Sequence, residues 1–162
     1  MSKILDLMNR QITDETYASY LYLSMALYFE RENYDGFAHW MHLQSQEEAS
    51  HAAKFMNHIH ERGGVVKLEA IEAPKHEWNS PLEVFEEALA HEKLVTASIV
   101  KIMDEAVAAK DYASISLLHW FIDEQVEEED TAQSIVDRLK RCNNHIACVM
   151  AIDSKLGQRQ AD

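Results

Sequence analysis

The sequence predicts an all-α protein: an up-down four-helix bundle with a long crossover between its second and third helices, followed by a short fifth helix. Three observations predict this fold class. The chain has only 4 glycines and 2 prolines among 162 residues, too few for the turns of a β-rich domain. Apolar residues recur at three- and four-residue spacing in four long blocks, which is the pattern of amphipathic helices. The breaks between the blocks are short, long and short, as in two helical hairpins joined by a crossover.

The first two helices are separated by a turn and followed by a long connection. The turn is predicted at residues 33–36, where the letters NYDG supply residue types that favour tight turns. The second helix is expected to end at Gly63 and Gly64, because glycine commonly terminates helices. Residues 64–79, which contain Pro74, then form the crossover.

The third and fourth helices carry clear start signals. Ser80 and Glu83 have capping-box spacing, and Pro81 stands at the first helical position. Asp111 is the expected N-cap of the fourth helix. A short apolar fifth helix follows, ends near Gly157, and has a face that needs a partner such as another subunit. The prediction is one domain over residues 1–162, with the bundle at about 3–141 and the fifth helix at about 144–156.

Charge and cysteine content exclude several classes of protein. A formal net charge of −13 disfavours nucleic acid and anionic membranes as partners, since both attract basic surfaces. The N-terminal residues reach Asp6 after two apolar positions, so no signal peptide is expected. Cys142 and Cys148 fall within one predicted helical region, so we expect no disulfide between them and a cytoplasmic location.

Polar residues interrupt all four apolar stripes about halfway along each helix. They are Glu15 in the first, Gln44, Glu48 and His51 in the second, Glu92 in the third, and Gln125 and Glu128 in the fourth. Positions 15 and 48 differ by 33, as do positions 92 and 125, so the two hairpins superimpose with an offset of 77. The same offset relates Glu47 to Glu124. With a rise of ~1.5 Å per residue, the glutamates, His51 and Gln125 reach one level of the core.

Carboxylates gathered at one level of a core require compensation. Burying an ionised carboxylate costs several kcal/mol, and like charges repel. Either some of the carboxyls are protonated or a polyvalent cation neutralises them. Oxygen donors with one imidazole suit an ion such as Fe, Mn or Zn, and one bridging carboxylate would allow two ions. A single glutamate on a stripe usually lies at a helix edge and reaches water, but its recurrence in four helices at one height favours a metal site.

Four strings resemble the motifs of the ferritin family, specifically the bacterial non-haem ferritins, over nearly the whole chain: ITDETYASYLY, QEEASH, AHEKL and DEQVEEE. The resemblance implies a ferritin-like iron-storage protein with ferroxidase activity. In such a protein Fe(II) is oxidised by O2 or H2O2, and ferric oxyhydroxide accumulates in a hollow shell. The resemblance further implies a homo-oligomer of twenty-four subunits, with the fifth helix packed around the four-fold axes.

Carried over residue by residue, the resemblance implies a dinuclear iron centre and a third iron site. The set is Glu15, Glu48 and His51 for the first iron; Glu92 and Glu128, with Glu48 bridging, for the second; Gln125 beside this centre; and Glu47, Glu124 and Glu127 for a third site reached from the inner surface. Tyr22 matches a tyrosine beside the centre and Trp120 a nearby tryptophan, although core packing alone also explains both. Ala49 stands where bacterioferritins carry their haem-ligating methionine, so no haem is expected.

Two other functions are compatible with these residues. One is a storage and buffering protein whose centre binds metal but turns over poorly. The other is a di-metal oxidase of the same bundle type that forms no shell. Oxygen consumption separates the first from a ferroxidase, and particle size separates the second. The histidines other than His51 match no constellation and are expected at surfaces or interfaces.

Overall fold

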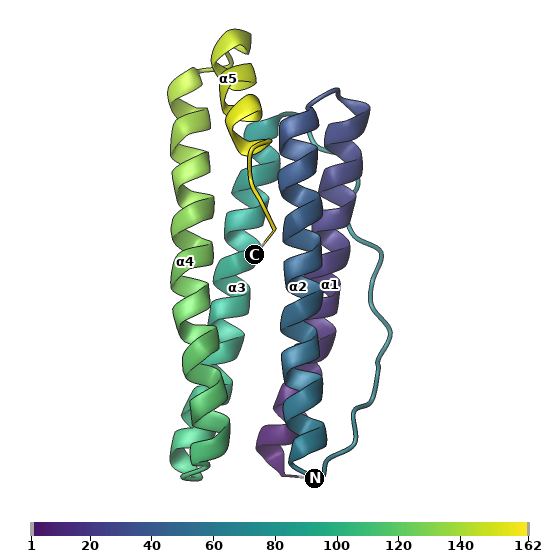
Figure 1. Ribbon diagram of the computed structural model, residues 1–162, viewed down its shortest axis with the longest axis vertical. Helices are drawn as coiled ribbons and strands as arrows, with labels where there is room; N and C mark the ends of the chain where they lie inside the picture. Colours follow the sequence, from purple (N-terminus) through teal and green to yellow (C-terminus); the bar gives the residue numbers. More distant parts are fainter. Residues whose placement is uncertain (1, 162) are drawn as a thin grey trace.

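Four long helices run side by side along the long axis of the molecule, and a short fifth helix lies at one end (Figure 1). The structure, a computed structural model, describes residues 2–161 and contains no strand within that range. The helices are α1 (Lys3–Arg31), α2 (Asp35–Glu61), α3 (Pro81–Ala108), α4 (Tyr112–Cys142) and α5 (Ile146–Leu156). The all-α fold class and the order of the helices are therefore confirmed. Within the described range, no helix is long and apolar enough to cross a membrane.

Local signals set the boundaries of the long helices. Asn33 adopts the left-handed conformation, with a φ of 60°, and turns the chain between α1 and α2. Ser80 Oγ accepts a hydrogen bond from Glu83 N (3.1 Å) at the start of α3. Asp111 Oδ1 accepts one from Ser114 N (3.2 Å) at the start of α4. The two N-caps expected from the sequence are confirmed.

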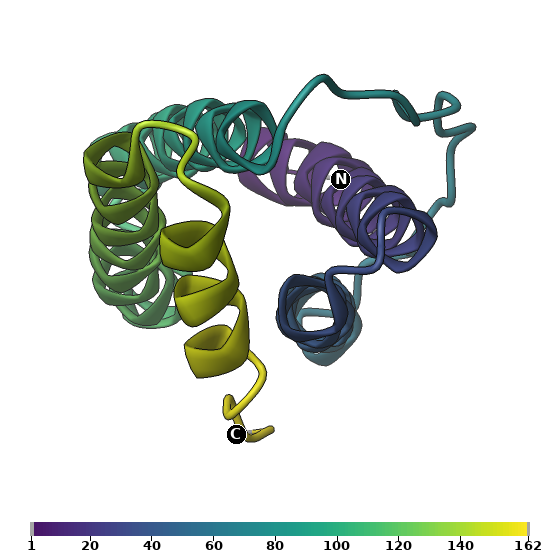
Figure 2. The ribbon, with the colours of Figure 1, turned by 90° about the horizontal axis from the view of Figure 1, so that it is seen from above.

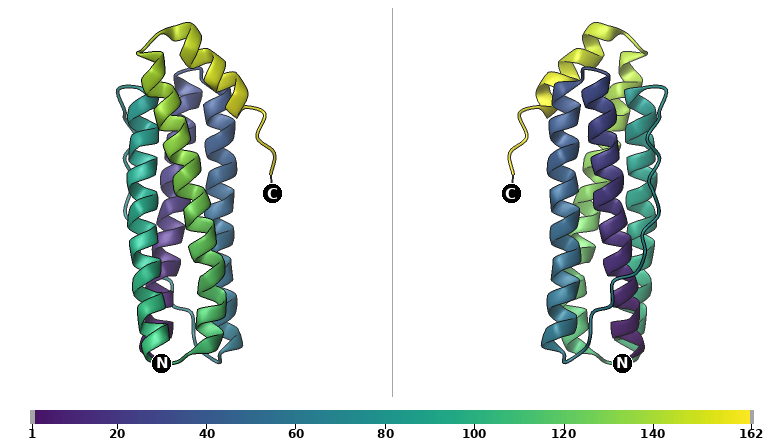
Figure 3. Two further views of the ribbon diagram at one scale, coloured as in Figure 1. Left: turned by 90° about the vertical axis from the view of Figure 1, so that its left-hand side faces the viewer. Right: turned by 90° about the vertical axis from the view of Figure 1, so that its right-hand side faces the viewer.

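The crossover between α2 and α3 runs the length of the bundle on its outer side (Figure 3). Two hydrogen bonds attach it to α1, from Asn9 Nδ2 to Lys67 O and from Lys67 N to Asn9 Oδ1, both at 2.8 Å. Trp78 near its end is buried, and its ring centroid lies 5.3 Å from that of Tyr28. The crossover thus covers α1, whereas the face between α2 and α4 is free of it.

A layer of polar side chains divides the apolar core into two clusters, and each cluster joins all four long helices. The cluster nearer α5 is rich in aromatic rings and includes Phe29, Phe37 and Phe85. The cluster nearer the start of α1 includes Phe55 and Phe121, whose rings stack with centroids 4.1 Å apart. Burial of these rings holds the four helices at fixed relative heights, because the apolar area removed from water stabilises only one packing arrangement.

Helix α5 packs against its own bundle at the start of α2. Asp153 Oδ1 accepts a hydrogen bond from Phe37 N (2.8 Å) and so caps α2, whose own N-cap residue supplies no side-chain bond. Gly36 permits this close approach, since a Cβ at that position would lie 1.7 Å from Asp153 O. The absence of a side chain at Gly36 is therefore what allows α5 to dock.

The two faces of α5 differ in exposure. Val149 and Leu156 are buried, so the bundle itself covers part of the apolar face that the sequence indicates needs a partner. Ile146 and Met150 remain 61% and 41% exposed. This second face is free to contact another molecule.

A disulfide joins Cys142 to Cys148, so the expectation of no disulfide is wrong. The two cysteines do not share a helix, because α4 ends at Cys142 and the next two residues, Asn143 and Asn144, adopt left-handed conformations. This reversal brings the two Cα atoms to 5.4 Å. In one continuous helix, residues six apart would be separated by ~9 Å.

Replacing Gly36 by alanine is expected to loosen α5, because the new Cβ would collide with the Asp153 backbone and break its bond to Phe37 N. Hydrogen exchange of the amides of α5 measures the effect and should accelerate by at least ~10-fold. The lost cap should lower the free energy of unfolding by roughly 0.5–2 kcal/mol. Asp153→Asn keeps the Oδ1 acceptor and should retain most of the protection. Unchanged exchange in Gly36→Ala would contradict this docking role.

Candidate metal centre

Seven polar side chains form the layer between the two apolar clusters, and none is more than 8% exposed. They are Glu15 from α1; Gln44, Glu48 and His51 from α2; Glu92 from α3; and Gln125 and Glu128 from α4. All four long helices contribute to one level of the core, as the repeat in the sequence predicts.

Three of these side chains form a first group of candidate metal ligands. Glu15, Glu48 and His51 each place one donor atom within 4.8 Å of the others. His51 Nδ1 lies 3.2 Å from Glu48 Oε2 and 3.9 Å from Glu15 Oε2. Glu48 and His51 are three residues apart and therefore project from the same face of α2.

A second group of candidate ligands is equally compact and consists only of carboxylates. Glu48, Glu92 and Glu128 also bring one donor atom each within 4.8 Å of one another. Glu48 belongs to both groups, so its two oxygens can serve two neighbouring positions. If each group held one ion, Glu48 would be a carboxylate common to both.

Side-chain amides and a tyrosine hold the carboxylates in place. Gln11 Nε2 donates to Glu15 Oε1 (2.9 Å). Gln125 Nε2 donates to Glu92 Oε2 (3.1 Å), and the hydroxyl of the fully buried Tyr22 donates to Glu92 Oε1. These bonds orient the oxygens without adding positive charge.

Gln44 and Gln11 are site residues that reasoning from the sequence did not assign. Gln44 Nε2 donates both to Glu48 Oε1 (2.9 Å) and to Glu128 Oε2 (2.8 Å), so it links α2 to α4. Each glutamine stands four residues before a glutamate of the layer, Gln11 before Glu15 and Gln44 before Glu48. In each pair, the four-residue spacing places the glutamine and the glutamate on one face of the helix. This spacing is the signal in the sequence that could have identified both glutamines.

Burial and the negative charge of Glu48 raise the pKa of three of these carboxyls in the absence of a cation. Burial, followed by the charge of Glu48, raises the pKa of Glu92 to about 7 and that of Glu128 to about 10. The same two causes raise the pKa of Glu15 well above its ordinary value. The layer therefore binds protons that a metal ion would displace.

The pKa shifts of Glu48 and His51 favour the charged form of each group, unlike the shifts of the other three carboxyls. Burial disfavours the charged form of Glu48, but hydrogen bonds from His51 and Gln44 outweigh it and lower the pKa of this carboxyl. Burial likewise opposes the charge of His51, yet the bond and charge of Glu48 raise the pKa of the imidazole. Both shifts result from the close contact between Glu48 and His51, whose atoms Oε2 and Nδ1 lie 3.2 Å apart.

One fully buried oxygen of the layer has no hydrogen-bond partner among the described residues. Glu15 Oε2 is fully buried and unpaired, which costs free energy because its lone pairs have lost water without replacement. It points to within 3.9 Å of His51 Nδ1. A cation held by Glu15 and His51 would satisfy this oxygen, so the residues present fit a metal ion.

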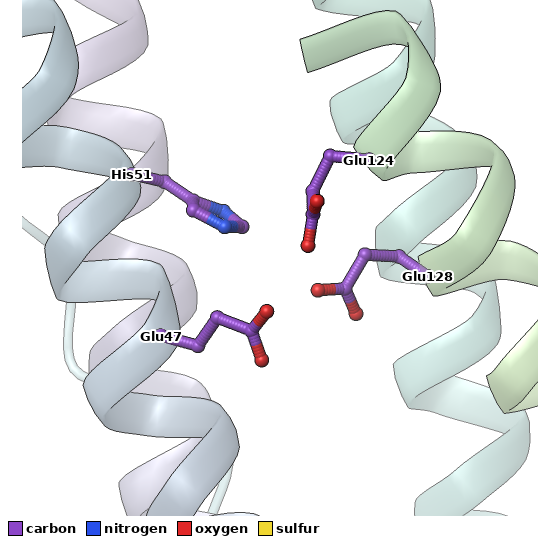
Figure 4. Close-up of side chains that lie close together, drawn as sticks. All are labelled: Glu47, His51, Glu124 and Glu128. Atoms are coloured by element: carbon purple, nitrogen blue, oxygen red, sulfur yellow. The ribbon is translucent and has the colours of Figure 1, made fainter. Parts of the chain in front are cut away.

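A third group lies at the edge of the layer, on the face between α2 and α4. Glu47, His51, Glu124 and Glu128 bring one donor atom each within 4.8 Å of one another, and Figure 4 shows their side chains converging from the two helices. His51 and Glu128 also belong to the buried groups. The third group is therefore continuous with the buried layer. We call these four residues the inner cluster.

A cavity of about 470 Å³ lies over the inner cluster. Its lining includes Glu47, Glu124, Glu127 and Glu128. Burial, then a hydrogen bond with Glu124, raises the pKa of Glu47 to about 7. Glu127 lines the cavity but is exposed and contributes no donor atom to the inner cluster. Arg159, which sequence reasoning did not single out, also borders this cavity.

The remaining predicted residues lie close to the layer. Trp120 is 38% exposed, and its ring centroid lies 5.4 Å from that of His51 in an edge-on contact. Two of the histidines expected at surfaces or interfaces are not exposed in the single chain. His58 is buried and bonds to Ser114 Oγ (3.2 Å), and His91 Nε2 is buried with no partner.

Comparison with protein families gives one match that spans most of the chain. The model of the family described as Ferritin-like domain matches residues 5–142. This range covers the four long helices except the first two residues of α1, and it includes every side chain of the layer.

Comparison with individual proteins agrees with this match. A bacterial non-heme ferritin of Bacteroides fragilis is 48% identical over 157 residues, which cover 97% of this chain and 98% of that protein. One of Staphylococcus epidermidis is 39% identical over 97% of this chain and 95% of that protein. A solved structure described as an open pore ferritin of the archaeon Archaeoglobus fulgidus superimposes with a TM-score of 0.97 at 43% identity and covers 99% of both chains.

The metal-free protein is expected to lose stability as the pH rises. Because the pKa of Glu92 is raised to about 7, the folded state binds more protons than the unfolded state between pH ~4.5 and ~7. The free energy of unfolding should fall across this window by up to ~1.4 kcal/mol per pH unit for this group. Urea unfolding of Glu92→Gln should show a flatter dependence, since the amide stays neutral and still accepts a bond from Tyr22.

Glu72→Gln is the matched control, because Glu72 is exposed in the crossover and far from the layer in sequence. It should keep the pH dependence of the parent. Equal slopes in Glu92→Gln and in the parent would show that Glu92 is not the group responsible.

Proposed function

This chain belongs to the ferritin family, and on that premise we propose that it is an iron-storage protein with ferroxidase activity. It oxidises Fe(II) with O2 or H2O2 and deposits ferric oxyhydroxide inside a hollow shell. The observation that carries this proposal is the buried layer in which two ligand groups share Glu48.

Iron is the substrate, and each of the two buried groups would hold one Fe(II). Glu15, Glu48 and His51 form the first position, and Glu92 and Glu128, with Glu48 bridging, form the second. Donor atoms within 4.8 Å of one another support one ion per group. These donors would also accept Mn or Zn, and family membership is what favours iron.

The chemistry follows from the charge of the layer. Two Fe(II) ions supply the two electrons that reduce O2 to H2O2, or H2O2 to water. Anionic oxygen donors stabilise Fe(III) more than Fe(II), because the ferric ion has the higher charge and is harder. Protons leave the carboxyls with raised pKa, Glu15, Glu92 and Glu128, when iron binds. The reduction of O2 to H2O2 consumes two protons, so this release supports the reaction.

Two neighbours of the centre would act by positioning Glu92. Gln125 and Tyr22 each donate a hydrogen bond to one oxygen of Glu92. Together these bonds restrict the orientation of Glu92, which would belong only to the second iron position. No separate role is assigned to Trp120.

Iron would leave the centre toward the face between α2 and α4. Glu47 and Glu124 lie in the inner cluster, and Glu127 lines the adjoining cavity. His51 and Glu128 are common to the buried layer and the inner cluster, which supports a short transfer between them. We assign Glu47, Glu124 and Glu127 to a third, transit site.

A shell requires contacts between copies of the chain, and the expected assembly is a 24-mer. Large apolar side chains stand exposed in several places, among them Leu68 at 78%, Tyr112 at 74% and Ile146 at 61%. Exposed apolar side chains at several places on one subunit support multiple subunit interfaces. The acidic charge of −13 supports neither nucleic acid nor a membrane as partner.

The proposal includes a cytoplasmic location. The disulfide between Cys142 and Cys148 is the one observation against it, because thiols stay reduced in most cytoplasmic proteins.

Replacing Glu48 by glutamine tests the ferroxidase activity. The variant loses the carboxylate common to both positions, so the initial rate of Fe(II)-dependent O2 consumption should fall by at least ~10-fold. Glu72→Gln removes the same charge from the exposed crossover and should leave the rate unchanged. A Glu48→Gln protein as fast as the parent would exclude oxidation at this centre and favour a buffering protein.

Particle size and iron retention test storage. Size-exclusion chromatography should give a particle of about 450 kDa, which is the mass of a closed 24-mer of the 18.7 kDa chain. After aerobic loading with Fe(II), iron and protein should elute together in that peak. A monomer or dimer, or a particle that retains no iron, would contradict the storage function.

A further inference from the structure

The segment that follows α5 descends along the face between α2 and α4 (Figures 1 and 2). Arg159 in this segment places its guanidinium at the mouth of the cavity over the inner cluster. Its backbone is held as well, because His39 Nε2 lies 2.8 Å from Arg159 O. The tail therefore brings one fixed positive charge to the candidate exit for iron.

The guanidinium contacts three residues of α2. Its carbon lies 4.7 Å from the centroid of the Trp40 ring, and Nη1 donates to Trp40 O (3.3 Å) and Gln44 Oε1 (2.9 Å). Nη2 donates to Glu47 Oε2 at 2.6 Å. The side chains of Arg159 and Glu47 are only 21% and 17% exposed, so this ion pair is largely shielded from water.

The ion pair shares a carboxylate with the inner cluster. Glu47 is one of its four members, and Arg159 engages one of the two oxygens of Glu47. A metal ion at the inner cluster and the guanidinium would therefore draw on the same negative charge at close range. Like charges brought so close in a shielded site repel strongly.

Arg159 also reaches the buried layer through one intervening side chain. A guanidinium can only donate hydrogen bonds, so Gln44 must turn Oε1 toward Arg159 and its Nε2 toward the carboxylates. Gln44 Nε2 then donates to Glu48 and Glu128. The tail thus fixes the amide that links the bridging carboxylate to α4.

We propose that Arg159 is a tethered counter-cation of the inner cluster: it holds Glu47 when no metal ion is bound there and is displaced when one enters. This role rests on the proposed function, because it assigns the tail control over the transit site of the same centre. Arg159 is a positioning residue, since it acts through Glu47 and Gln44. The tail would thereby set the affinity of the inner cluster for cations and the ease with which iron passes to it.

Zn2+ binding to the full chain tests the proposal without iron oxidation. Isothermal titration calorimetry should resolve two tight sites, assigned to the buried groups, and a weaker site at the inner cluster. In Arg159→Gln the weaker site should bind Zn2+ roughly 10-fold more tightly, while the two tight sites change little. Arg138→Gln is the matched control, since Arg138 is exposed on the same face and borders a neighbouring cavity with Arg159. It should leave all affinities as in the parent.

Thermodynamic linkage supplies a second measurement, the response of the tail to Zn2+. A tail with only a structural role would show no such response. If the tail excludes metal, then metal must release the tail by the same factor. Saturating Zn2+ should therefore accelerate hydrogen exchange at residues 158–161 in the parent, and should not do so in Glu47→Gln.

The outcomes separate this proposal from the proposed function. A parent that binds Zn2+ at neither tight site would overturn the metal centre and this proposal together. Two intact tight sites, with a weaker site equally strong in the parent, Arg159→Gln and Arg138→Gln, would overturn the role of Arg159 alone. A tail whose exchange does not respond to Zn2+ would overturn it as well. In a Glu47→Gln background, Arg159→Gln should have no further effect on Zn2+ binding.

Discussion

The free energy needed to bury four carboxyls in one layer of a helix bundle determines the rest of this structure. Ionised, Glu15, Glu48, Glu92 and Glu128 would repel one another where water cannot screen them. Three of them, Glu15, Glu92 and Glu128, have raised pKa values, which favour the neutral form. Glu48 is hydrogen-bonded to His51, and side-chain amides donate to all four carboxyls. A metal ion bound in the layer would displace the protons and compensate the negative charge in their place.

The apolar clusters above and below the layer provide the rigidity that this arrangement needs. Both clusters span all four long helices, so no helix can slide without breaking packing at two levels. The faces of the bundle are not equivalent, however. The crossover is bonded to α1, whereas the cavity opens between α2 and α4. The cavity over the inner cluster therefore lies away from the crossover, and Arg159 of the tail lines it.

Sequence patterns predicted the features that depend on regular helix geometry, except for the roles of Gln11 and Gln44. The level shared by Glu15, Glu48, Glu92 and Glu128 follows from a constant rise per residue, and Asp111 caps its helix as expected. Features that depend on the path of the chain after a break were not predictable. Two left-handed asparagines reverse the chain after α4 and bring the cysteines together. The same reversal and the docking of α5 carry Arg159 to Glu47, and no periodicity encodes that direction.

The offset of 77 residues between the two hairpins also relates the members of the inner cluster to one another. Its four members are two pairs related by that offset, Glu47 with Glu124 and His51 with Glu128. Each hairpin therefore contributes two of the four side chains, at equivalent positions of the repeat. Arg159 lies outside the repeat and pairs with Glu47. At this cluster the tail therefore engages the carboxylate of the first hairpin, whereas its counterpart Glu124 in the second hairpin has no such bond among the described residues.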